Sequence, residues 1–452
     1  MPVLFAAIAL TPEGWKSGVR LTIEGGTIAA LECDAAPRVG DERYSILIPA
    51  VANLHSHAFQ RGMAGLAEVR GEERDTFWTW RETMYRFALT MTPDDVEAVA
   101  AQLYVEMLEA GFAAVAEFHY LHHAPNGSPY ATRAEMAGRI VAAARRAGIG
   151  LTLLPVFYAH STFGGAPPKP EQRRFVNDLD SFTRLIVECR DLVEDSRGEA
   201  LGIAPHSLRA VTPSELTSLV SLAGGGPIHI HAAEQVKEVD DCLAWSGARP
   251  VRWLLDHVAI DDRWCLVHST HMDDGETSEL ANSHAVAGLC PVTEANLGDG
   301  IFNASGYLQA GGRFGVGTDS NISIGVAPEL RQLEYAQRLR EGARNVCAPS
   351  GASTGRSLLD AICSGGAQAL ARRSGRLAVG AVADIISLRN NHPTLAGKVG
   401  DQVLDAWIFS TGNGLVDCVW SGGKKVVTEG RHRAREEIAA KFRTTMLKLS
   451  AC

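Results

Sequence analysis

Apolar and polar positions follow two periodicities along the middle of the chain. Apolar runs predict eight buried strands, at residues 45–54, 112–118, 150–160, 200–206, 227–231, 264–268, 285–290 and 313–318. Helical spacing predicts helices between several of them, at residues 93–110, 133–147, 213–222, 237–245 and 328–344. Strands that alternate with helices pair in parallel, and eight of them close naturally into a barrel. The pattern therefore predicts an α/β fold, a (β/α)8 TIM barrel.

Both ends of the chain have a different texture, rich in short strands joined by glycine turns. The strand-like segments lie at residues 19–24, 27–31, 382–388 and 416–428. We expect the two ends to form one small β-sandwich domain. The expected division is residues 1–44 plus 376–431 for the β domain, 45–375 for the barrel and 432–452 for a C-terminal helical tail. Residues 59–80 and 161–172 lack a periodic pattern and follow strands, so we expect loops over the active face.

Composition narrows the possible partners and the compartment. The chain is 46% hydrophobic and 21% charged, with a formal net charge of −9, which is not the basic footprint of a nucleic-acid-binding protein. No apolar run reaches the roughly 18 to 20 residues of a membrane span, so we expect no membrane partner. Nine cysteines occur without a C-x-x-C motif, which favours a reducing compartment and a cytoplasmic location.

Polar side chains collect where the predicted strands end, and this is where TIM barrels carry their chemistry. His55 and His57 follow the first strand and, at i and i+2, point to the same face. Imidazole nitrogen is a good ligand for zinc and similar ions. The other strand-end residues are Glu117, His119 and Tyr120, His206 and Arg209, His231 and Glu234, His268, and Asp319.

These residues belong to longer motifs, at residues 53–61, 77–82, 116–120, 206–213, 264–271 and 293–302. Together the motifs resemble the amidohydrolase superfamily, and within it the N-formimino-L-glutamate deiminases, over nearly the whole chain. The resemblance implies that His55, His57, His231 and Asp319 hold one zinc ion. Residues 202–206 contain no lysine that could bridge a second metal.

Two points stay open in this ligand set. His229 faces the same way as His231, but His231 lies nearer the strand end and precedes Glu234 by three residues, so we prefer it. Iron or another divalent metal suits imidazole and carboxylate as well as zinc does.

The resemblance implies hydrolysis of N-formimino-L-glutamate to N-formyl-L-glutamate and ammonia, a step of histidine degradation. A zinc-activated hydroxide would attack the amidine carbon, Asp319 would take the proton of the water, and His268 would orient the hydroxide. Glu234 would shuttle a proton to the leaving nitrogen.

The substrate of this reaction is a small dicarboxylate, and arginine binds carboxylates bidentately. The resemblance places five residues around it: Gln60, Arg81, Tyr120, His206 and Arg209. Relatives of this kind often form homodimers, and we expect one here.

Several alternatives remain at this stage. A deaminase of a nucleobase or other heteroaromatic amine would share the metal ligands and Glu234, and a non-catalytic binding protein would have lost one of them. Glu234 alone fits a helix N-terminal acid, and Arg209 fits a surface ion pair. We expect Trp78 and Trp80 to be core packing, the cysteines to be buried small apolar groups, and three further histidines to be solvated loop residues: His119, His122 and His123.

Overall fold

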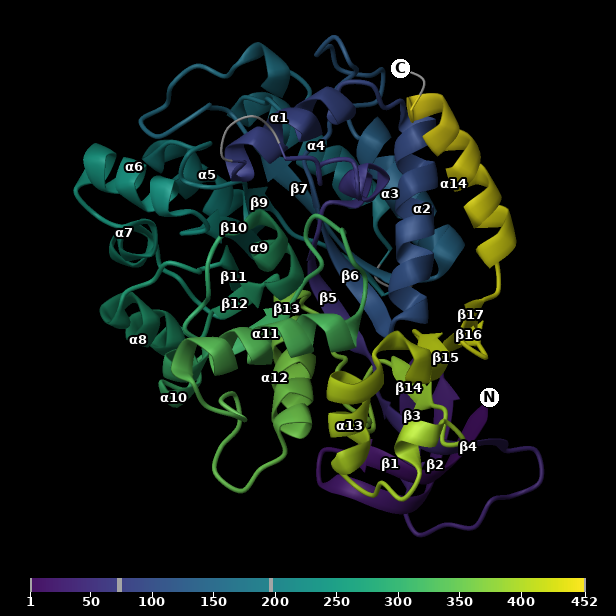
Figure 1. Ribbon diagram of the computed structural model, residues 1–452. Coiled ribbons are helices and arrows are strands. Elements are labelled where there is room, and N and C mark those ends of the chain that lie inside the picture. The colour runs from purple at the N-terminus through teal and green to yellow at the C-terminus, as the bar shows by residue number, and fades with distance from the viewer. Residues whose placement is uncertain (1, 71–74, 195–197, 451–452) are drawn as a thin grey trace.

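Parallel strands close into a barrel at the centre of the molecule (Figure 1). The computed structural model describes residues 2–70, 75–194 and 198–450. The barrel strands are β5 (Val51–Ser56), β6 (Phe112–His119), β7 (Gly150–Phe157), β8 (Glu199–Leu201) with β9 (Ala204–Pro205), β10 (Ile228–Ala232), β11 (Trp264–His268), β12 (Val286–Leu289) and β13 (Arg313–Val316). Every pairing among them is parallel. The predicted TIM-barrel fold is confirmed.

Short parallel bridges join the ladders at two seams of the barrel. Ile203 pairs with Ile228 and Ser207 with His231 at one seam, and Ser56 pairs with Asp319 at the other. The Ser207–His231 and Ser56–Asp319 bridges lie at or next to the strand ends where the polar candidate residues are found. Barrel closure therefore brings the distant segments of the candidate site together.

Helices cover the outside of the barrel, and local caps explain where several of them begin. Thr92 and Thr212 cap α2 (Pro93–Glu109) and α5 (Pro213–Ala223), each with proline in the first turn and a carboxylate closing a capping box. The remaining barrel helices are α3 (Glu135–Ala147), α4 (Leu179–Leu192), α6 (Val236–Ser246), α7 (Pro250–His257), α8 (Asp274–Asn282), α9 (Pro291–Leu297), α10 (Ala304–Gln309), α11 (Val326–Glu341) and α12 (Thr354–Ala369).

The two chain ends build one eight-stranded mixed sheet beside the barrel (Figure 1). Its order is β17 (Arg431–His432), β16 (Lys424–Thr428), β15 (Val416–Ser421), β14 (Ile385–Leu388), β4 (Glu42–Pro49), β1 (Val3–Thr11), β2 (Gly14–Glu24) and β3 (Thr27–Glu32). The origin of this sheet in both chain ends is as predicted. The residue boundaries of the domains stay a prediction.

One predicted strand is in fact two strands. The apolar run at residues 45–54 contains the end of β4, which pairs with β1 and β14, and most of β5, which belongs to the barrel. Ala50 separates them and donates its N–H to the carbonyl of Asp384 at 3.0 Å. Both halves are buried, so their apolar pattern is continuous although their sheets differ.

The predicted loops contain short helices. Residues 59–80 include most of η1 (Ala58–Met63) and the start of α1 (Phe77–Ala88), which begins at a Thr76 capping box; residues 71–74 lie outside the described part of the chain. Residues 161–172 end in η2 (Pro170–Gln172). The prediction of a purely irregular segment was therefore wrong for residues 77–80.

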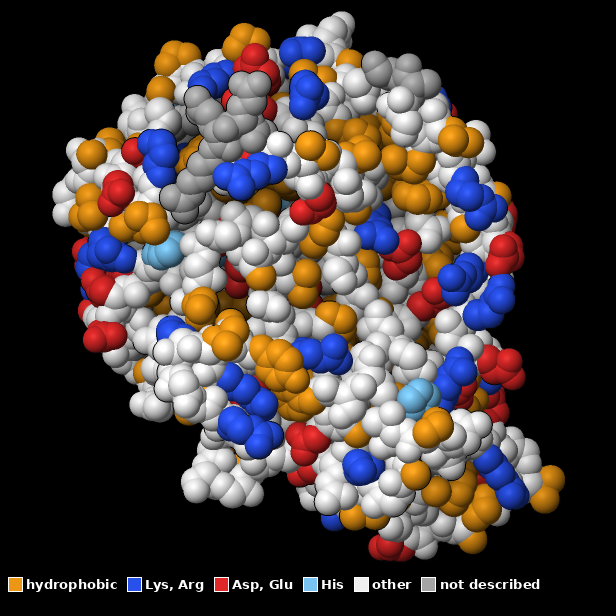
Figure 2. All heavy atoms as spheres, in the orientation of Figure 1, with side chains coloured by type: hydrophobic (Ala, Val, Ile, Leu, Met, Phe, Trp, Pro, Cys, Tyr) orange, Lys and Arg blue, Asp and Glu red, His pale blue; other side chains and the backbone are white. Residues whose placement is uncertain are grey.

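The C-terminal part of the chain forms helices that pack against helices of the barrel. α14 (Arg435–Ser450) lies along α2 (Figure 1) and forms ion pairs from Lys448 to Asp95 and from Arg435 to Glu109. Before it come η4 (Pro393–Leu395), α13 (Gln402–Ala406), η5 (Trp407–Thr411) and η6 (Asn413–Leu415). Figure 2 shows acidic and basic side chains interspersed on one face. Among the described residues, no helix combines the length and apolarity needed to cross a bilayer.

Candidate metal centre and substrate pocket

Four predicted ligands meet at one point at the end of the barrel. Nε2 of His55 lies 3.2 Å from Nε2 of His57 and 3.2 Å from Nε2 of His231. Oδ1 of Asp319 lies 3.4 Å from Nε2 of His55 and 3.2 Å from Nε2 of His57. All four side chains are buried, and their ligand atoms lie within 4.8 Å of one another.

The hydrogen bonds of the outer ring nitrogens show that this cluster fits a metal ion. Nδ1 of His57 donates to the carbonyl of Phe118 at 3.0 Å, and Nδ1 of His231 donates to the carbonyl of His206 at 2.9 Å. When neutral, each ring then carries its lone pair on Nε2, the nitrogen that faces the cluster. The lone pair on Nε2 of His57 and the carboxylate oxygen of Asp319 lie 3.2 Å apart and repel one another unless a cation lies between them.

Burial sets the protonation of the cluster. It lowers the pKa of His55 to about 3 and holds the pKa of His231 well below its usual range. Burial alone would raise the pKa of Asp319, but the adjacent imidazoles of His55 and His57 hold that pKa well below its ordinary value. Neutral imidazoles and an ionised carboxylate are the forms that bind a divalent metal.

Left-handed backbone conformations occur where the site residues leave their strands. The φ angles are 53° at Ala233, 69° at His268 and 46° at Asp319. Side chains with a Cβ rarely adopt this region, and such residues cluster at functional sites. The chain therefore turns sharply at three strand ends and directs polar side chains across the barrel mouth.

Glu234 and His268 lie beside the four candidate metal ligands. Nε2 of His268 is 3.8 Å from Oε1 of Glu234 and 3.8 Å from Oδ2 of Asp319. Burial would lower the pKa of His268, but Glu234, Asp319 and Glu294 raise it to about 10. Burial raises the pKa of Glu234. A buried acid and a buried histidine thus share the space next to the metal cluster, as general acid–base chemistry requires.

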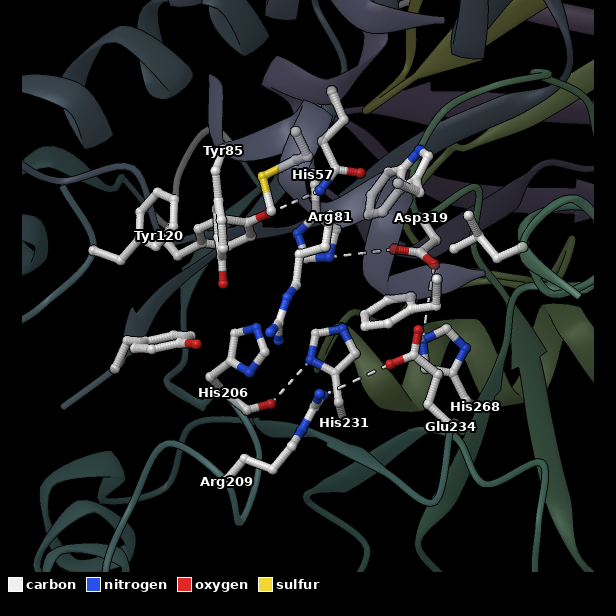
Figure 3. A pocket seen from close by; sticks show the side chains of 17 residues that line it. His57, Arg81, Tyr85, Tyr120, His206, Arg209, His231, Glu234, His268 and Asp319 are labelled. Atoms are coloured by element: carbon white, nitrogen blue, oxygen red, sulfur yellow. Dashed lines mark hydrogen bonds and ion pairs between the residues drawn. The ribbon is translucent and has the colours of Figure 1, made fainter. Parts of the chain in front are cut away.

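A pocket opens onto these groups (Figure 3). All five predicted substrate-binding residues line it: Gln60, Arg81, Tyr120, His206 and Arg209. Gln60 Nε2 donates to the hydroxyl of Tyr120 at 2.7 Å, and Arg209 Nη2 lies 3.8 Å from Oε2 of Glu234. Figure 3 shows the Arg81 and Arg209 guanidinium groups reaching into the same space as His206. The pocket therefore has a cationic end, formed by Arg81 and Arg209, and the candidate metal ligands at its other end.

The indole ring of Trp78 contacts both guanidinium groups at this cationic end. The guanidinium carbon of Arg81 lies 4.5 Å from the centre of the Trp78 ring, and that of Arg209 lies 5.8 Å from it. Trp80, from the same helix, lines the pocket. Trp80 also packs against the hydrophobic core, as predicted. The prediction of core packing was wrong for Trp78, which contacts the two guanidinium groups.

Other expectations have mixed outcomes. Arg209 is only 6% exposed, so a surface ion pair is excluded.

His229 Nε2 donates to the carbonyl of Ala369 at 2.8 Å, in the deeper packed position expected of it. His119 and His122 are buried, so the prediction of solvated loop histidines was wrong for them. Seven of the eight described cysteines are buried as predicted, and Cys33 is exposed.

Comparison with known families bears on the fold and the site together. The model of the amidohydrolase family matches residues 46–426. The chain belongs to the amidohydrolase family. A second model, described as the N-terminal domain of the formimidoylglutamate deiminase HutF, matches residues 1–45. The predicted family resemblance and the predicted hydrolase class are thereby confirmed.

Individual relatives agree with this assignment. The formimidoylglutamate deiminase of Pseudomonas aeruginosa is 50% identical to this amidohydrolase over 445 residues, which is 98% of each chain. A 5-methylthioadenosine/S-adenosylhomocysteine deaminase of Natronomonas pharaonis is 28% identical and covers 85% of this chain and 83% of its own.

Solved structures show the same architecture. An amidohydrolase from Brucella melitensis is 56% identical, covers 100% of both chains and has a TM-score of 0.96. An adenosine deaminase from Xanthomonas campestris with bound zinc is 21% identical, covers 100% of this chain and 98% of its own, and has a TM-score of 0.82. The latter supports the fold alone.

Proposed function

We propose that this amidohydrolase hydrolyses N-formimino-L-glutamate to N-formyl-L-glutamate and ammonia, a step of histidine degradation. The observation that carries the proposal is the pair Arg81 and Arg209, which face the metal cluster across one pocket. Guanidinium groups match the two carboxylates of this substrate, and its amidine would lie at the metal. The 50% identical deiminase of Pseudomonas aeruginosa supports the same activity.

We propose that His55, His57, His231 and Asp319 hold one zinc ion. Three imidazoles and one carboxylate suit zinc, although iron or another divalent ion fits the same donors. When bound, such an ion lowers the pKa of a water molecule to about 7, and this supplies a nucleophile near neutral pH. No lysine occurs at residues 202–206 to bridge a second ion.

The chain's own residues then move the protons. Asp319, ionised beside the cluster, accepts a proton from the attacking water. His268 directs Nε2 toward the space between Asp319 and Glu234 and orients the nucleophile. Glu234, whose pKa is raised by burial, gives a proton to the leaving nitrogen. A C–O bond forms and the C–N bond to the terminal nitrogen breaks. Both protons of the water end on that nitrogen, one relayed through Asp319 and Glu234 and one from the newly formed hydroxyl, so ammonia leaves and both carboxyl groups return to their starting forms.

The remaining pocket residues bind the amino-acid part of the substrate. Arg81 and Arg209 each pair with a carboxylate, and Gln60, Tyr120 and His206 add hydrogen bonds from the pocket wall. Oε1 of Gln60 and Nε of Arg209 are buried without a partner among the described residues. These unused groups are free to bind a polar ligand, as expected of a site built to hold one.

A nucleobase or heteroaromatic amine deaminase remains the alternative, because Tyr85, Tyr158 and Phe175 give the pocket an aromatic wall. Steady-state kinetics decide between the two. We expect kcat/KM for N-formimino-L-glutamate to exceed that for guanine or 5-methylthioadenosine by at least about 10⁴-fold, because a neutral base has no carboxylates to pair with the guanidinium groups of Arg81 and Arg209. Faster ammonia release from either base would reject the proposal. A cytoplasmic location and a homodimer stay predictions.

A further inference from the structure

A buried glutamate lies behind His268, on the side away from the pocket. Oε1 of Glu294 accepts a hydrogen bond from Nδ1 of His268 at 3.2 Å. The same oxygen accepts the backbone N–H of Cys290 at 2.8 Å. Glu294 is 4% exposed and His268 is 1% exposed. The mechanism above uses Nε2 of His268 and assigns Glu294 no role.

Glu294 stands on a short helix that is fixed at several points. α9 begins directly after β12, and Oε2 of Glu329 accepts the N–H of Val292 at 2.9 Å. The hydroxyl of Thr293 donates to the carbonyl of Thr318 at 3.1 Å, one residue before Asp319. The carboxylate of Glu294 is therefore held in place relative to both His268 and the metal cluster.

We propose that Glu294 is a positioning residue that acts through His268. Glu294 accepts a hydrogen bond from Nδ1–H of His268, and this bond fixes the imidazole ring. Nε2 of His268 then points at the space between Glu234 and Asp319 (Figure 3). A carboxylate behind a histidine orients catalytic histidines in other enzymes in the same way. This inference rests on the proposed role of His268 in hydrolysis.

Two other roles of Glu294 make different predictions. Glu294 could only support the start of α9. Glu329 would then have the same role, because it accepts the N–H of Val292 in α9 and does not contact His268. His268, Cys290 and Glu294 also have ligand atoms within 4.8 Å of one another, as a second metal site would. Burial holds the pKa of the Cys290 thiol well above its usual range, which opposes the thiolate that such a site needs.

The test uses zinc-loaded full-length enzyme, with metal content, kcat and KM for N-formimino-L-glutamate measured for each variant. Glu294→Gln keeps Oε1, which makes both hydrogen bonds, and Glu294→Ala removes it. Glu329→Gln is the matched control in the same helix support. His268→Ala and the double variant His268→Ala/Glu294→Ala complete a cycle that separates direct from indirect effects.

We expect Glu294→Ala to lower kcat about 10- to 100-fold with KM within twofold of wild type and one metal per chain. Glu294→Gln should recover at least half of the lost kcat on a logarithmic scale, and Glu329→Gln should keep wild-type kinetics. In the His268→Ala background, loss of Glu294 should change kcat less than twofold.

Three results would overturn the inference: the same loss in Glu329→Gln, multiplicative losses in the double variant, or a second metal that disappears with Glu294→Ala. A wild-type enzyme inactive on N-formimino-L-glutamate would instead reject the proposed function, so the two failures are distinguishable.

Discussion

His57 and Asp319 meet twice, once through their backbones and once through their side chains. The N–H of His57 donates to the carbonyl of Asp319 at 3.0 Å, and Nε2 of His57 lies 3.2 Å from Oδ1 of Asp319. The N–H of Asp319 also donates to the carbonyl of His55 at 3.0 Å. The contact that closes the barrel between its first and last strands thus also assembles the proposed metal site.

Replacing the carboxylate of Asp319 tests this double role. We expect Asp319→Asn to keep the barrel closed, because the backbone bonds remain, while kcat falls about 10²- to 10⁴-fold and bound metal decreases. Metal analysis, steady-state kinetics and circular dichroism measure the three effects. Asp41→Asn removes a carboxylate paired with Arg20 of β2, in the mixed sheet beside the barrel, and should change neither metal content nor kcat. Full metal and full activity in Asp319→Asn would contradict the assignment.

Arg209 should contribute mainly to substrate binding. Lysine keeps the charge but loses the planar fork, so we expect Arg209→Lys to raise KM about 10- to 100-fold with a smaller effect on kcat. Initial rates over a wide substrate range measure this split. Arg263→Lys, in an exposed pair with Asp261, is the control for a general arginine effect. An unchanged KM in Arg209→Lys would mean that Arg209 does not contact the carboxylates.

Trp78 should act through the two arginines that it contacts. Removing its ring takes away cation–π contacts worth about 0.5–1 kcal/mol each at partly exposed positions. We therefore expect Trp78→Leu to raise KM about threefold to tenfold at nearly constant kcat. In an Arg81→Lys background the increase should be smaller, because one of the contacts is already changed. A loss of kcat without a change in KM would place Trp78 elsewhere in the mechanism.

Glu117 should make stability depend on pH near neutrality. Its buried carboxyl accepts the N–H of Ala58 at 2.6 Å and the hydroxyl of Tyr104 at 3.1 Å, and burial raises its pKa to about 7. Between the unfolded pKa of about 4.3 and this value, the folded state holds a proton that the unfolded state has released. The free energy of unfolding therefore falls as pH rises through this window, by up to about 4 kcal/mol.

Glu117→Gln mimics the protonated side chain and should remove this slope. Urea unfolding of wild type and variant from pH 5 to 8 measures the free energy of unfolding of each. We expect the two curves to diverge as pH rises, with the variant relatively more stable at pH 8. Parallel curves across the range would show that Glu117 does not titrate there.

The barrel was predictable from local patterns, and its ligand cluster from polar residues at strand ends together with the family resemblance. Apolar runs mark the strands, and polar residues follow them at the edge where parallel strands converge, as His231 and Asp319 do. His231 rather than His229 belongs to the cluster because the two lie one layer apart on the same face of β10. Spacing within one strand was enough to make that distinction.

Features set by tertiary contacts were not predictable. The break at Ala50 divides a continuous apolar run between two sheets, and both halves are buried. The environment of Trp78 depends on where α1 lies over the pocket, and the position of α1 cannot be predicted from local periodicity. His122 is buried because its Nε2 donates to the carbonyl of Val156 at 2.8 Å, a partner 34 residues away. Glu294 lay in a recognised motif, but only the fold places it behind His268.

The most direct test follows the formimino carbon. N-formimino-L-glutamate labelled with ¹³C at that carbon is incubated with enzyme of known metal content, and the products are identified by NMR together with an ammonia assay. We predict label in N-formyl-L-glutamate and one ammonia per turnover. Label in formamide, with free glutamate as the second product, would contradict it, because the bond to the glutamate nitrogen would have broken instead.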